Sequence, residues 1–330
     1  MSMITSERDS LTEALEQKIS STKTKWLNSN ILSYNQFDRE RLSDLCHVTD
    51  AMRDMVKKVG GCDLLKGKIL NNVFYEPSTR TMCSFESAMQ RLGGTTMRIL
   101  PSYSSSKKGE TLQDTLRCLE CYGDITVLRH PEKGSVPQVA KYLRKPLLNA
   151  GDGVGEHPTQ ALLDFYTIQN EMNGKVDGLT IVLLGDLKHG RTVHSLSRLL
   201  MNYDVKLRLV SPDSLKMPDY IKDDIQKMEF TEHTALSDVL PEADVLYVTR
   251  VQKERFSNQE DYLNVKGSFD INKATLVKAK SKMIVMHPLP RVGEIHEDVD
   301  SDPRAKYFKQ MENGMYVRMS LLALCLTASH

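Results

Sequence analysis

The chain has 330 residues, 40% of them hydrophobic, and its 44 Lys and Arg nearly balance 43 Asp and Glu, giving a formal net charge of +1. This length predicts two domains with ordinary cores, and the near-neutral charge argues against bulk attraction to nucleic acid or a membrane. Six cysteines without disulfide-type spacing indicate a reducing compartment. No apolar run is long enough to span a bilayer, so we expect a cytoplasmic protein.

Residues 1–24 form a polar N-terminal extension that we expect to be partly helical or frayed. Leu11, Leu15 and Ile19 are spaced to share one helical face. The acidic residues of this stretch speak against a mitochondrial presequence, and it has no apolar signal-peptide core. A helix is predicted next, over 37–59.

The stretch 69–94 predicts a strand, a turn and a helix, and the rest of the chain is organised around it. Residues 69–75 are rich in apolar side chains, and Pro77 ends this strand. Phe85, Met89 and Leu92 then recur at helical spacing before the Gly pair at 93–94.

The turn carries Ser78-Thr79-Arg80-Thr81 at the start of that helix. A helix N-terminus offers backbone N–H donors and a partial positive charge, and three hydroxyls and a guanidinium are added here. The fork of an arginine suits phosphate oxygens. We therefore predict a phosphate-binding turn. It is not a P-loop, because the stretch 61–68 has the wrong glycine spacing and no Ser or Thr after its lysine.

Strands and helices alternate through the remaining sequence, which predicts parallel α/β domains. The expected strands are 96–100, 125–128, 146–150, 179–184, 205–211, 244–249 and 282–286. The expected helices are 111–122, 136–142, 159–170 and 191–201, with further amphipathic helices between 211 and 244 and a last helix from 313. The Ser-rich basic loop 101–108 is either a disordered surface loop or a mobile flap that brings Ser and Lys to an anion.

Arginines recur where open parallel sheets bind ligands, at strand ends and helix starts. Arg129 follows one expected strand, Arg191 begins a helix after a glycine-rich turn, and Arg250 follows another strand. His157 and Gln160 begin a helix after a second glycine-rich loop. The helix dipole keeps a histidine in that place neutral, so it can donate to a carbonyl or phosphate oxygen.

No Ser-His-Asp or Cys-His set has a plausible order, and no metal quartet or dinucleotide fingerprint is present. The lone Cys118-x-x-Cys121 pair lies in a helical pattern and is interpreted as structural. We expect neither a metal nor a cofactor. Such a site catalyses by holding two anionic reactants together and stabilising charge on an oxygen.

Taken together, these motifs resemble those of the aspartate transcarbamoylase catalytic chains of the aspartate/ornithine carbamoyltransferase superfamily. The resemblance covers roughly residues 26–326 in family order and is carried by 78–81 (STRT), 104–111 with KKGET, 157–160 (HPTQ), 185–192 (GDLKHGRT), 250–255 (RVQKER) and 287–291 (HPLPR).

The resemblance implies transfer of the carbamoyl group of carbamoyl phosphate to the amine of L-aspartate, in pyrimidine synthesis. It implies two doubly wound domains, each a parallel sheet flanked by helices. The carbamoyl phosphate domain would be 25–158, completed by the returning C-terminal helix 307–330, and the aspartate domain 159–306. The active unit would be a homotrimer whose sites are shared between neighbouring subunits.

The resemblance also implies roles for individual residues, residue by residue on the matching motifs. The catalytic set would be Arg80, Thr81, Lys108, Arg129 and His157. The carbamoyl phosphate contacts would be Ser78, Thr79, Arg80, Thr81, Ser104, Arg129, His157, Gln160 and Leu289. The aspartate contacts would be Lys108, Arg191, Arg250, Gln252, Leu289 and Pro290. Ser104 and Lys108 would come from a neighbouring subunit, and the Leu289–Pro290 bond would be cis.

One departure from the family pattern is Met82, where many members have a second arginine; we expect a lost salt bridge and no lost activity. The nearest alternative is an ornithine transcarbamoylase, which has a Cys where this chain has Pro288. Another alternative is a non-catalytic carbamoyl phosphate-binding module. A nicotinamide-linked dehydrogenase is disfavoured because the glycine fingerprint is missing.

Overall fold

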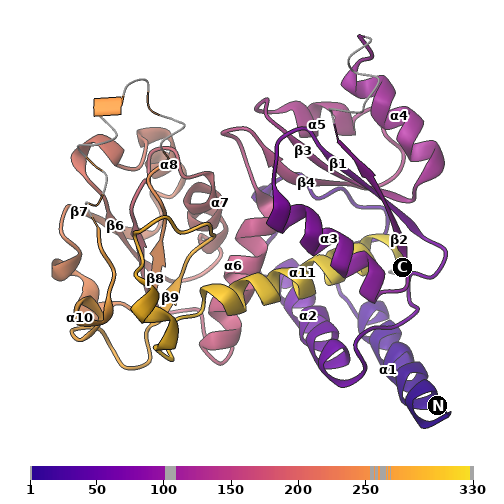
Figure 1. Cartoon of the computed structure of the whole chain (residues 1–330), viewed down its shortest axis with the longest axis horizontal. Helices are drawn as coiled ribbons and strands as arrows, with labels where there is room; N and C mark the ends of the chain where they lie inside the picture. The colour runs from indigo at the N-terminus through magenta and orange to yellow at the C-terminus, as the bar shows by residue number, and fades with distance from the viewer. Residues whose placement is uncertain are drawn as a thin grey trace. The chain divides into compact units, whose positions relative to one another are not determined.

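The structure is a computed structural model that describes residues 2–100, 109–252, 256, 259–260, 265, 267 and 269–327. The chain divides into two compact units, Met1–Leu163 with Asn313–His330, and Asp164–Glu312. Each unit is built on one sheet of parallel strands (Figure 1). The expected α/β fold with two parallel sheets flanked by helices is confirmed, while the domain assignment made from the sequence stays a prediction.

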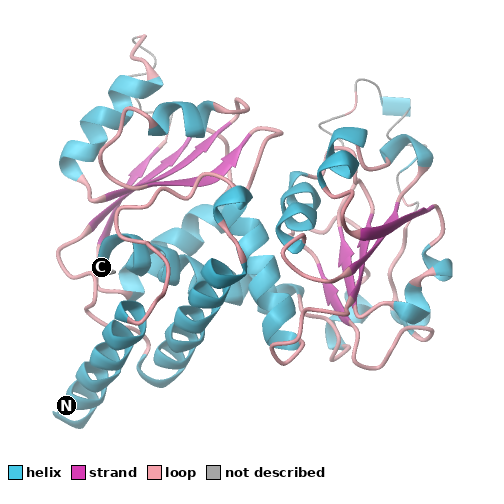
Figure 2. Ribbon diagram, turned by 180° about the vertical axis from the view of Figure 1, so that it is seen from behind, coloured by secondary structure: helices cyan, strands magenta, loops and turns pink. Residues whose placement is uncertain are grey.

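The sheet of the first unit has the strand order β2-β1-β3-β4. Its strands are β1 (Ile69–Phe74), β2 (Thr95–Ile99), β3 (Ile125–His130) and β4 (Leu147–Asp152). The helices that follow them are α3 (Thr79–Arg91), α4 (Leu112–Tyr122), α5 (Ser135–Ala140) and α6 (Pro158–Glu171). Helices α4 and α5 cover one face of the sheet and α3 lies on the other (Figures 1 and 2). On the first of these faces, Val73 and Leu128 of the sheet pack with Leu116 of α4 and Val136 of α5.

The C-terminal helix α11 (Tyr307–Thr327) returns to this unit, as expected. Ser320 accepts a hydrogen bond of 3.0 Å from Thr49 of α2 (Arg39–Val59). Arg318 donates to Ser84 of α3 over 2.9 Å. The C-terminal helix therefore helps to hold α2 and α3 in place.

The N-terminal extension is more regular than the sequence indicated, because it forms the helix α1 (Ser2–Ser20). Leu15 and Ile19 are each 1% exposed and are part of the core. Arg8 donates to Asp63 over 2.6 Å. The apolar spacing at 11, 15 and 19 was the signal for this helix, and burial of two of those side chains stabilises it.

The sheet of the second unit has the strand order β7-β6-β5-β8-β9. Its strands are β5 (Thr180–Leu184), β6 (Lys206–Val210), β7 (Glu229–His233), β8 (Val245–Val248) and β9 (Ile284–Met286). Its helices include α7 (Arg191–Leu200), α8 (Asp219–Asp224) and α10 (Lys273–Leu276). Alternate residues of β5, β8 and β9, such as Val182, Leu246 and Val285, pack with Leu276 of α10 and Val299.

Strand β7 corrects the expectation of helices only between 211 and 244. Among the strands that the structure describes, it lies at the edge of the sheet and pairs with β6 alone. Phe230 and His233 are its half-buried positions, and the rest of the strand is exposed. Its sequence therefore lacks the apolar alternation from which a strand is predicted.

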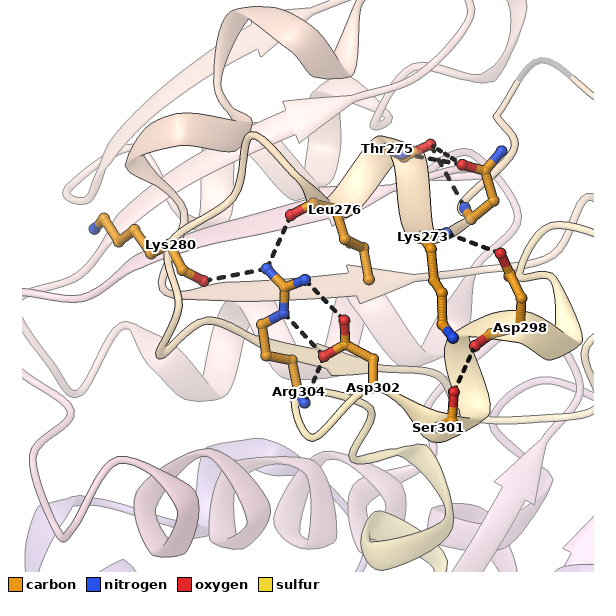
Figure 3. A network of polar contacts seen from close by, with 9 residues as sticks. Lys273, Thr275, Leu276, Lys280, Asp298, Ser301, Asp302 and Arg304 are labelled. Atoms are coloured by element: carbon orange, nitrogen blue, oxygen red, sulfur yellow. Dashed lines mark hydrogen bonds and ion pairs between the residues drawn. The ribbon is translucent and has the colours of Figure 1, made fainter.

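The segment between β9 and α11 is held by Arg304 (Figure 3). Its guanidinium grips the Asp302 carboxylate with two bonds of 2.8 and 2.9 Å and donates to the Leu276 carbonyl at the end of α10. The neighbouring backbone extends the sheet, since Val285 N donates to the Arg304 carbonyl over 2.8 Å. This network fixes where α11 begins relative to the residues that follow β9.

Candidate active site

The phosphate-binding turn predicted at 78–81 begins helix α3, directly after β1. Ser78 is the N-cap residue, and its hydroxyl makes no capping hydrogen bond to the helix. Thr79 and Arg80 are exposed, and Thr81 is buried at 7% exposure. The turn thus combines a helix N-terminus with hydroxyl groups and a guanidinium, as a phosphate site requires.

Arg129 comes from the neighbouring strand β3, beside the end of β1. The two strands are in register at Phe74 and Arg129, and Tyr75 N donates to the Arg129 carbonyl over 2.8 Å. The arginine is 9% exposed. Its Nε lies 3.0 Å from Oε2 of Glu76 and its Nη1 3.4 Å from the Ala150 carbonyl. The side chain is therefore fixed by a carboxylate and by the end of β4.

His157 and Gln160 lie at the start of α6, in the loop and first turn after β4. They are 4% and 7% exposed. The loop before them is held by Asp152, whose carboxylate accepts from Glu156 N at 2.6 Å and from Gly134 N at 3.0 Å. Buried polar side chains at the carboxyl ends of adjacent parallel strands mark the usual ligand position of such sheets.

The residues of this first half therefore come from one edge of one sheet. Strands β1, β3 and β4 are neighbours, and each leads directly into one part of the predicted site. Arg80 and Arg129 carry fixed positive charge, while the helix termini of α3 and α6 add backbone donors. This edge can bind a small dianion and donate hydrogen bonds to its oxygens.

In the second unit, β5 leads into the turn 185–190 and then into α7, whose first residue is Arg191. Gly185 has φ +119°, and a Cβ there would lie 2.3 Å from the Thr249 carbonyl oxygen, so only glycine fits. Asp186 is fully buried and accepts from His189 N over 2.9 Å, with the His189 Nδ1 3.1 Å away. Hydrogen bonds within the turn therefore stabilise the segment that precedes Arg191.

Arg250 and Gln252 follow β8, the neighbour of β5 in the sheet. The Gln252 amide donates to the His189 carbonyl over 3.2 Å, and Gln252 N lies 3.5 Å from Oδ2 of Asp186. The segment after β8 is thus joined to the turn after β5. Arg191, Arg250 and Gln252 are each half-buried at the same edge of this sheet.

The last predicted motif follows β9, the next strand of the sheet. The Leu289–Pro290 bond is cis, as the family resemblance implied, and Leu289 has φ +56°. Leu289 N donates to Nδ1 of His287 over 2.8 Å, and Nε2 of His287 lies 2.6 Å from Oε1 of Glu294. Burial lowers the pKa of His287 below its ordinary value, so the ring is neutral.

The structure places the predicted residues on two sheet edges, one in each unit. Ser78, Thr79, Arg80, Thr81, Arg129, His157 and Gln160 belong to the first, and Arg191, Arg250, Gln252, Leu289 and Pro290 to the second. Ser104 and Lys108 lie outside the described residues, as do Lys253, Glu254 and Arg255 of one motif. Sequence reasoning missed Glu76 and Glu294. Glu76 adjoins the 78–81 turn and was available as a signal, whereas the pairing of Glu294 with His287 exists only in the fold.

Among the described residues, no group of three or more His, Cys, Asp and Glu side chains is arranged to hold a metal ion. Over the same part of the chain, no helix combines the length and hydrophobicity needed to cross a membrane.

Comparison with known proteins gives two family matches that together span most of the chain. Residues 29–170 match the aspartate/ornithine carbamoyltransferase, carbamoyl-P binding domain, and residues 177–325 match the Asp/Orn binding domain of the same family. The chain is 57% identical over 301 residues to the multifunctional protein pyr1-3 of Dictyostelium discoideum, covering 91% of this chain but 14% of that protein. It is 48% identical to the aspartate carbamoyltransferase catalytic subunit of Thermococcus kodakarensis, covering 91% of this chain and 98% of the subunit.

Solved structures give the same result. Aspartate transcarbamoylase from Trypanosoma cruzi, in complex with carbamoyl phosphate and aspartate, superposes with a TM-score of 0.87 at 43% identity, over 91% of this chain and 98% of that one. The catalytic subunit of M. jannaschii aspartate transcarbamoylase has a TM-score of 0.84 at 45% identity, over 89% and 97% of the two chains. With both family domains matched in order and one parallel sheet under each, the chain belongs to the aspartate/ornithine carbamoyltransferase family.

Proposed function

We propose that this chain is an aspartate carbamoyltransferase, which transfers the carbamoyl group of carbamoyl phosphate to L-aspartate and yields N-carbamoyl-L-aspartate and phosphate, an early step of pyrimidine synthesis. The observation that carries the proposal is the division of charged groups between two sheet edges. The first suits a small phosphate, and the second offers two arginines and an amide, which suit a dicarboxylate. The relatives solved with carbamoyl phosphate and aspartate support the same pair of substrates.

In the proposed reaction the 78–81 turn binds the phosphate of carbamoyl phosphate. The carbamoyl oxygen accepts hydrogen bonds from Arg129, His157 and Thr81. These hydrogen bonds withdraw electrons from the carbonyl carbon and stabilise the oxyanion that forms. Gln160 and the backbone near Leu289 bind the carbamoyl amide. Residues 25–158 with 307–330 form the carbamoyl phosphate domain in this proposal, and 159–306 the aspartate domain.

Arg191, Arg250 and Gln252 bind the two carboxylates of aspartate and aim its neutral amine at the carbonyl carbon. The new C–N bond forms as the bond from carbon to the phosphate oxygen breaks. The amine proton leaves with the phosphate, which is the base nearest to the reacting nitrogen. No step uses a protein nucleophile, so the rate enhancement comes from positioning and charge.

The direct test is a steady-state assay of the purified chain with carbamoyl phosphate and either L-aspartate or L-ornithine. We expect N-carbamoyl-L-aspartate and phosphate in equal amounts, with ornithine a poor substrate, because the second edge provides two guanidinium groups for two carboxylates. A preference for ornithine would identify the other branch of the family. Binding of carbamoyl phosphate without phosphate release in the presence of aspartate would identify a non-catalytic module.

We further propose that the active unit is a homotrimer, in which Ser104 and Lys108 reach the site of a neighbouring subunit, and that the protein is cytoplasmic. The 98% coverage of the Thermococcus catalytic subunit supports an assembly of the family type. Exposed thiols at Cys83, Cys118 and Cys121 suit a reducing compartment. A mass measurement in solution tests the trimer. A mixture of Lys108→Ala and Arg80→Ala chains, each expected to have little activity alone, would regain activity only if sites are shared.

A further inference from the structure

The turn after β9 is held by hydrogen bonds to two side chains, His287 and Glu294, for which the family resemblance implies no role. The His287 ring accepts the Leu289 N–H at Nδ1 over 2.8 Å. Because Nδ1 is an acceptor, the ring proton lies on Nε2 and is donated to Oε1 of Glu294, 2.6 Å away. The other oxygen of Glu294 accepts from Val292 N over 3.0 Å. One pair of side chains therefore holds the turn at two points.

The protonation states of the pair are set by its surroundings. Burial lowers the pKa of His287, and its hydrogen bond to Glu294 opposes this shift only in part. Burial is the largest single influence and works to raise the pKa of Glu294, but the hydrogen bond and charge of His287 together with backbone hydrogen bonds from Glu294 and Val292 outweigh it, so the net shift is downward. A neutral imidazole and an ionised carboxylate are the states in which all three hydrogen bonds can form.

The backbone of His287 is anchored as firmly as its ring. His287 N donates to Oε1 of Gln310 over 2.9 Å, and the Gln310 amide donates to Oδ1 of Asp164 over 2.6 Å. Oδ2 of Asp164 accepts from the Tyr247 hydroxyl at 2.7 Å. All four side chains are fully buried, so the turn is attached to a rigid part of the second unit.

We infer that the Glu294–His287 pair is a positioning device for the aspartate half of the site, which sets the backbone of Leu289 through the acceptor Nδ1. The inference rests on the proposed function, in which the backbone at 288–290 contacts the substrates. In that proposal His287 and Glu294 are assigned no contact with a reactant. They act through the turn, whose unusual conformation at Leu289, with φ +56°, needs an internal partner for its N–H.

Two substitutions at the same position separate the two bonds of the ring. His287→Asn places an amide oxygen where Nδ1 stands, so it can accept the Leu289 N–H but cannot reach Glu294. His287→Gln places its amide where Nε2 stands, so it can donate to Glu294 and leaves the Leu289 N–H without an acceptor. Leaving the buried Leu289 N–H without an acceptor destabilises the binding conformation of the turn enough to change substrate affinity by about tenfold.

The expected result is a split between the two variants. His287→Gln raises the KM for aspartate about tenfold or more, with a smaller change in kcat, and it also weakens the binding of carbamoyl phosphate, whose amide the backbone near Leu289 contacts in the proposed function. His287→Asn restores the KM for aspartate to within about threefold of the wild type. Glu294→Gln, which can satisfy only one of its two donors, falls between them and serves if His287→Gln does not fold. Arg208→Gln, which breaks the pairs of Arg208 with Glu242 and Glu229, is the control for a loss of stability alone.

Amide hydrogen exchange of the peptide 287–292 gives a readout that does not depend on activity. We expect slow exchange in the wild type and His287→Asn and fast exchange in His287→Gln. Equal exchange and equal aspartate KM in the two variants would overturn the inference even if the wild type carbamoylates aspartate. If the three proteins show the expected exchange pattern but the wild type does not carbamoylate aspartate, the proposed function would be overturned and the positioning of the turn would remain supported.

Discussion

Glu76 holds Arg129 in this structure, with Oε2 of the carboxylate 3.0 Å from Nε of the guanidinium. Glu76 follows β1, Arg129 lies near the end of the adjacent strand β3, and the arginine is 9% exposed. The carboxylate thus occupies one edge of the group that is proposed to polarise the carbamoyl oxygen. It orients the guanidinium before any substrate arrives.

Glu76→Gln is expected to lower kcat by about tenfold or more, because a misaligned Arg129 stabilises the developing oxyanion less well. The affinity for carbamoyl phosphate should stay within about threefold, since a neutral amide removes no positive charge from the site. Steady-state kinetics and equilibrium binding of carbamoyl phosphate separate the two effects. Glu132→Gln, which changes an exposed carboxylate close to Arg129 in the sequence, is the matched control. A kcat equal to that of the control would show that the pairing does not matter for turnover.

Arg80→Ala is expected to reduce turnover by at least about a hundredfold, because it removes fixed charge from the phosphate-binding turn. The measurement is kcat and kcat/KM for carbamoyl phosphate at saturating aspartate. Arg53→Ala, which removes a guanidinium paired with Asp50 and Asp54 on α2, is expected to leave both parameters unchanged. Near-normal turnover in Arg80→Ala would contradict the proposal that the 78–81 turn binds the phosphate.

Arg250→Ala is expected to raise the KM for aspartate at least about tenfold while changing the KM for carbamoyl phosphate much less. The reason is that Arg250 belongs to the sheet of the second unit, whereas the 78–81 turn belongs to the first unit. Varying each substrate at a saturating level of the other measures this ratio. Equal increases in both KM values would show that the two sheet edges do not divide the substrates as proposed.

The buried side chain of His194 is expected to lower the free energy of unfolding at acid pH. The side chain is 4% exposed on α7, its Nε2 lies 2.7 Å from the Leu187 carbonyl, and burial lowers its pKa to about 4. The unfolded chain takes up a proton near pH 6.5, whereas the folded chain does so only near pH 4. The free energy of unfolding should therefore be highest above pH 6.5 and fall by about 3 kcal/mol from this group as the pH falls to 4.

Urea unfolding midpoints at several pH values between 4 and 7 measure this loss. His194→Gln keeps a donor for the Leu187 carbonyl but cannot titrate, so its midpoint should depend less steeply on pH. If both proteins lose stability in parallel, His194 is not the group responsible.

Much of the fold could be predicted from the sequence because most of its strands are buried on both faces and are separated by turns that contain glycine and proline. Val182 and Leu184 of β5 belong to a continuous apolar run that only a buried strand or core helix explains. Strand β7 could not be predicted, because an edge strand with one half-buried aromatic carries no such signal. Its position depends on pairing with β6, which is a tertiary contact.

The site shows the same division between local and tertiary information. Arg80 and Arg191 begin helices directly after strand-to-helix turns, and this local pattern sufficed to select them. Glu294 was not selected, because its contact with His287 passes through an irregular turn with no periodicity. Gln310 and Asp164 are 146 residues apart in sequence and meet only in the folded unit. The residues proposed to bind substrates were thus visible in the sequence, and the residues proposed to position them were not.

The central claim is that guanidinium groups on two separate sheet edges grip one pair of reactants. Calorimetric titration of N-(phosphonacetyl)-L-aspartic acid, a compound bound in one of the related Trypanosoma cruzi structures, into the wild type, Arg80→Ala and Arg250→Ala tests it most directly. We predict one molecule bound per chain and a loss of affinity of at least about tenfold in each variant, since each removes a charged contact to the same ligand. Wild-type affinity in either variant would contradict the claim.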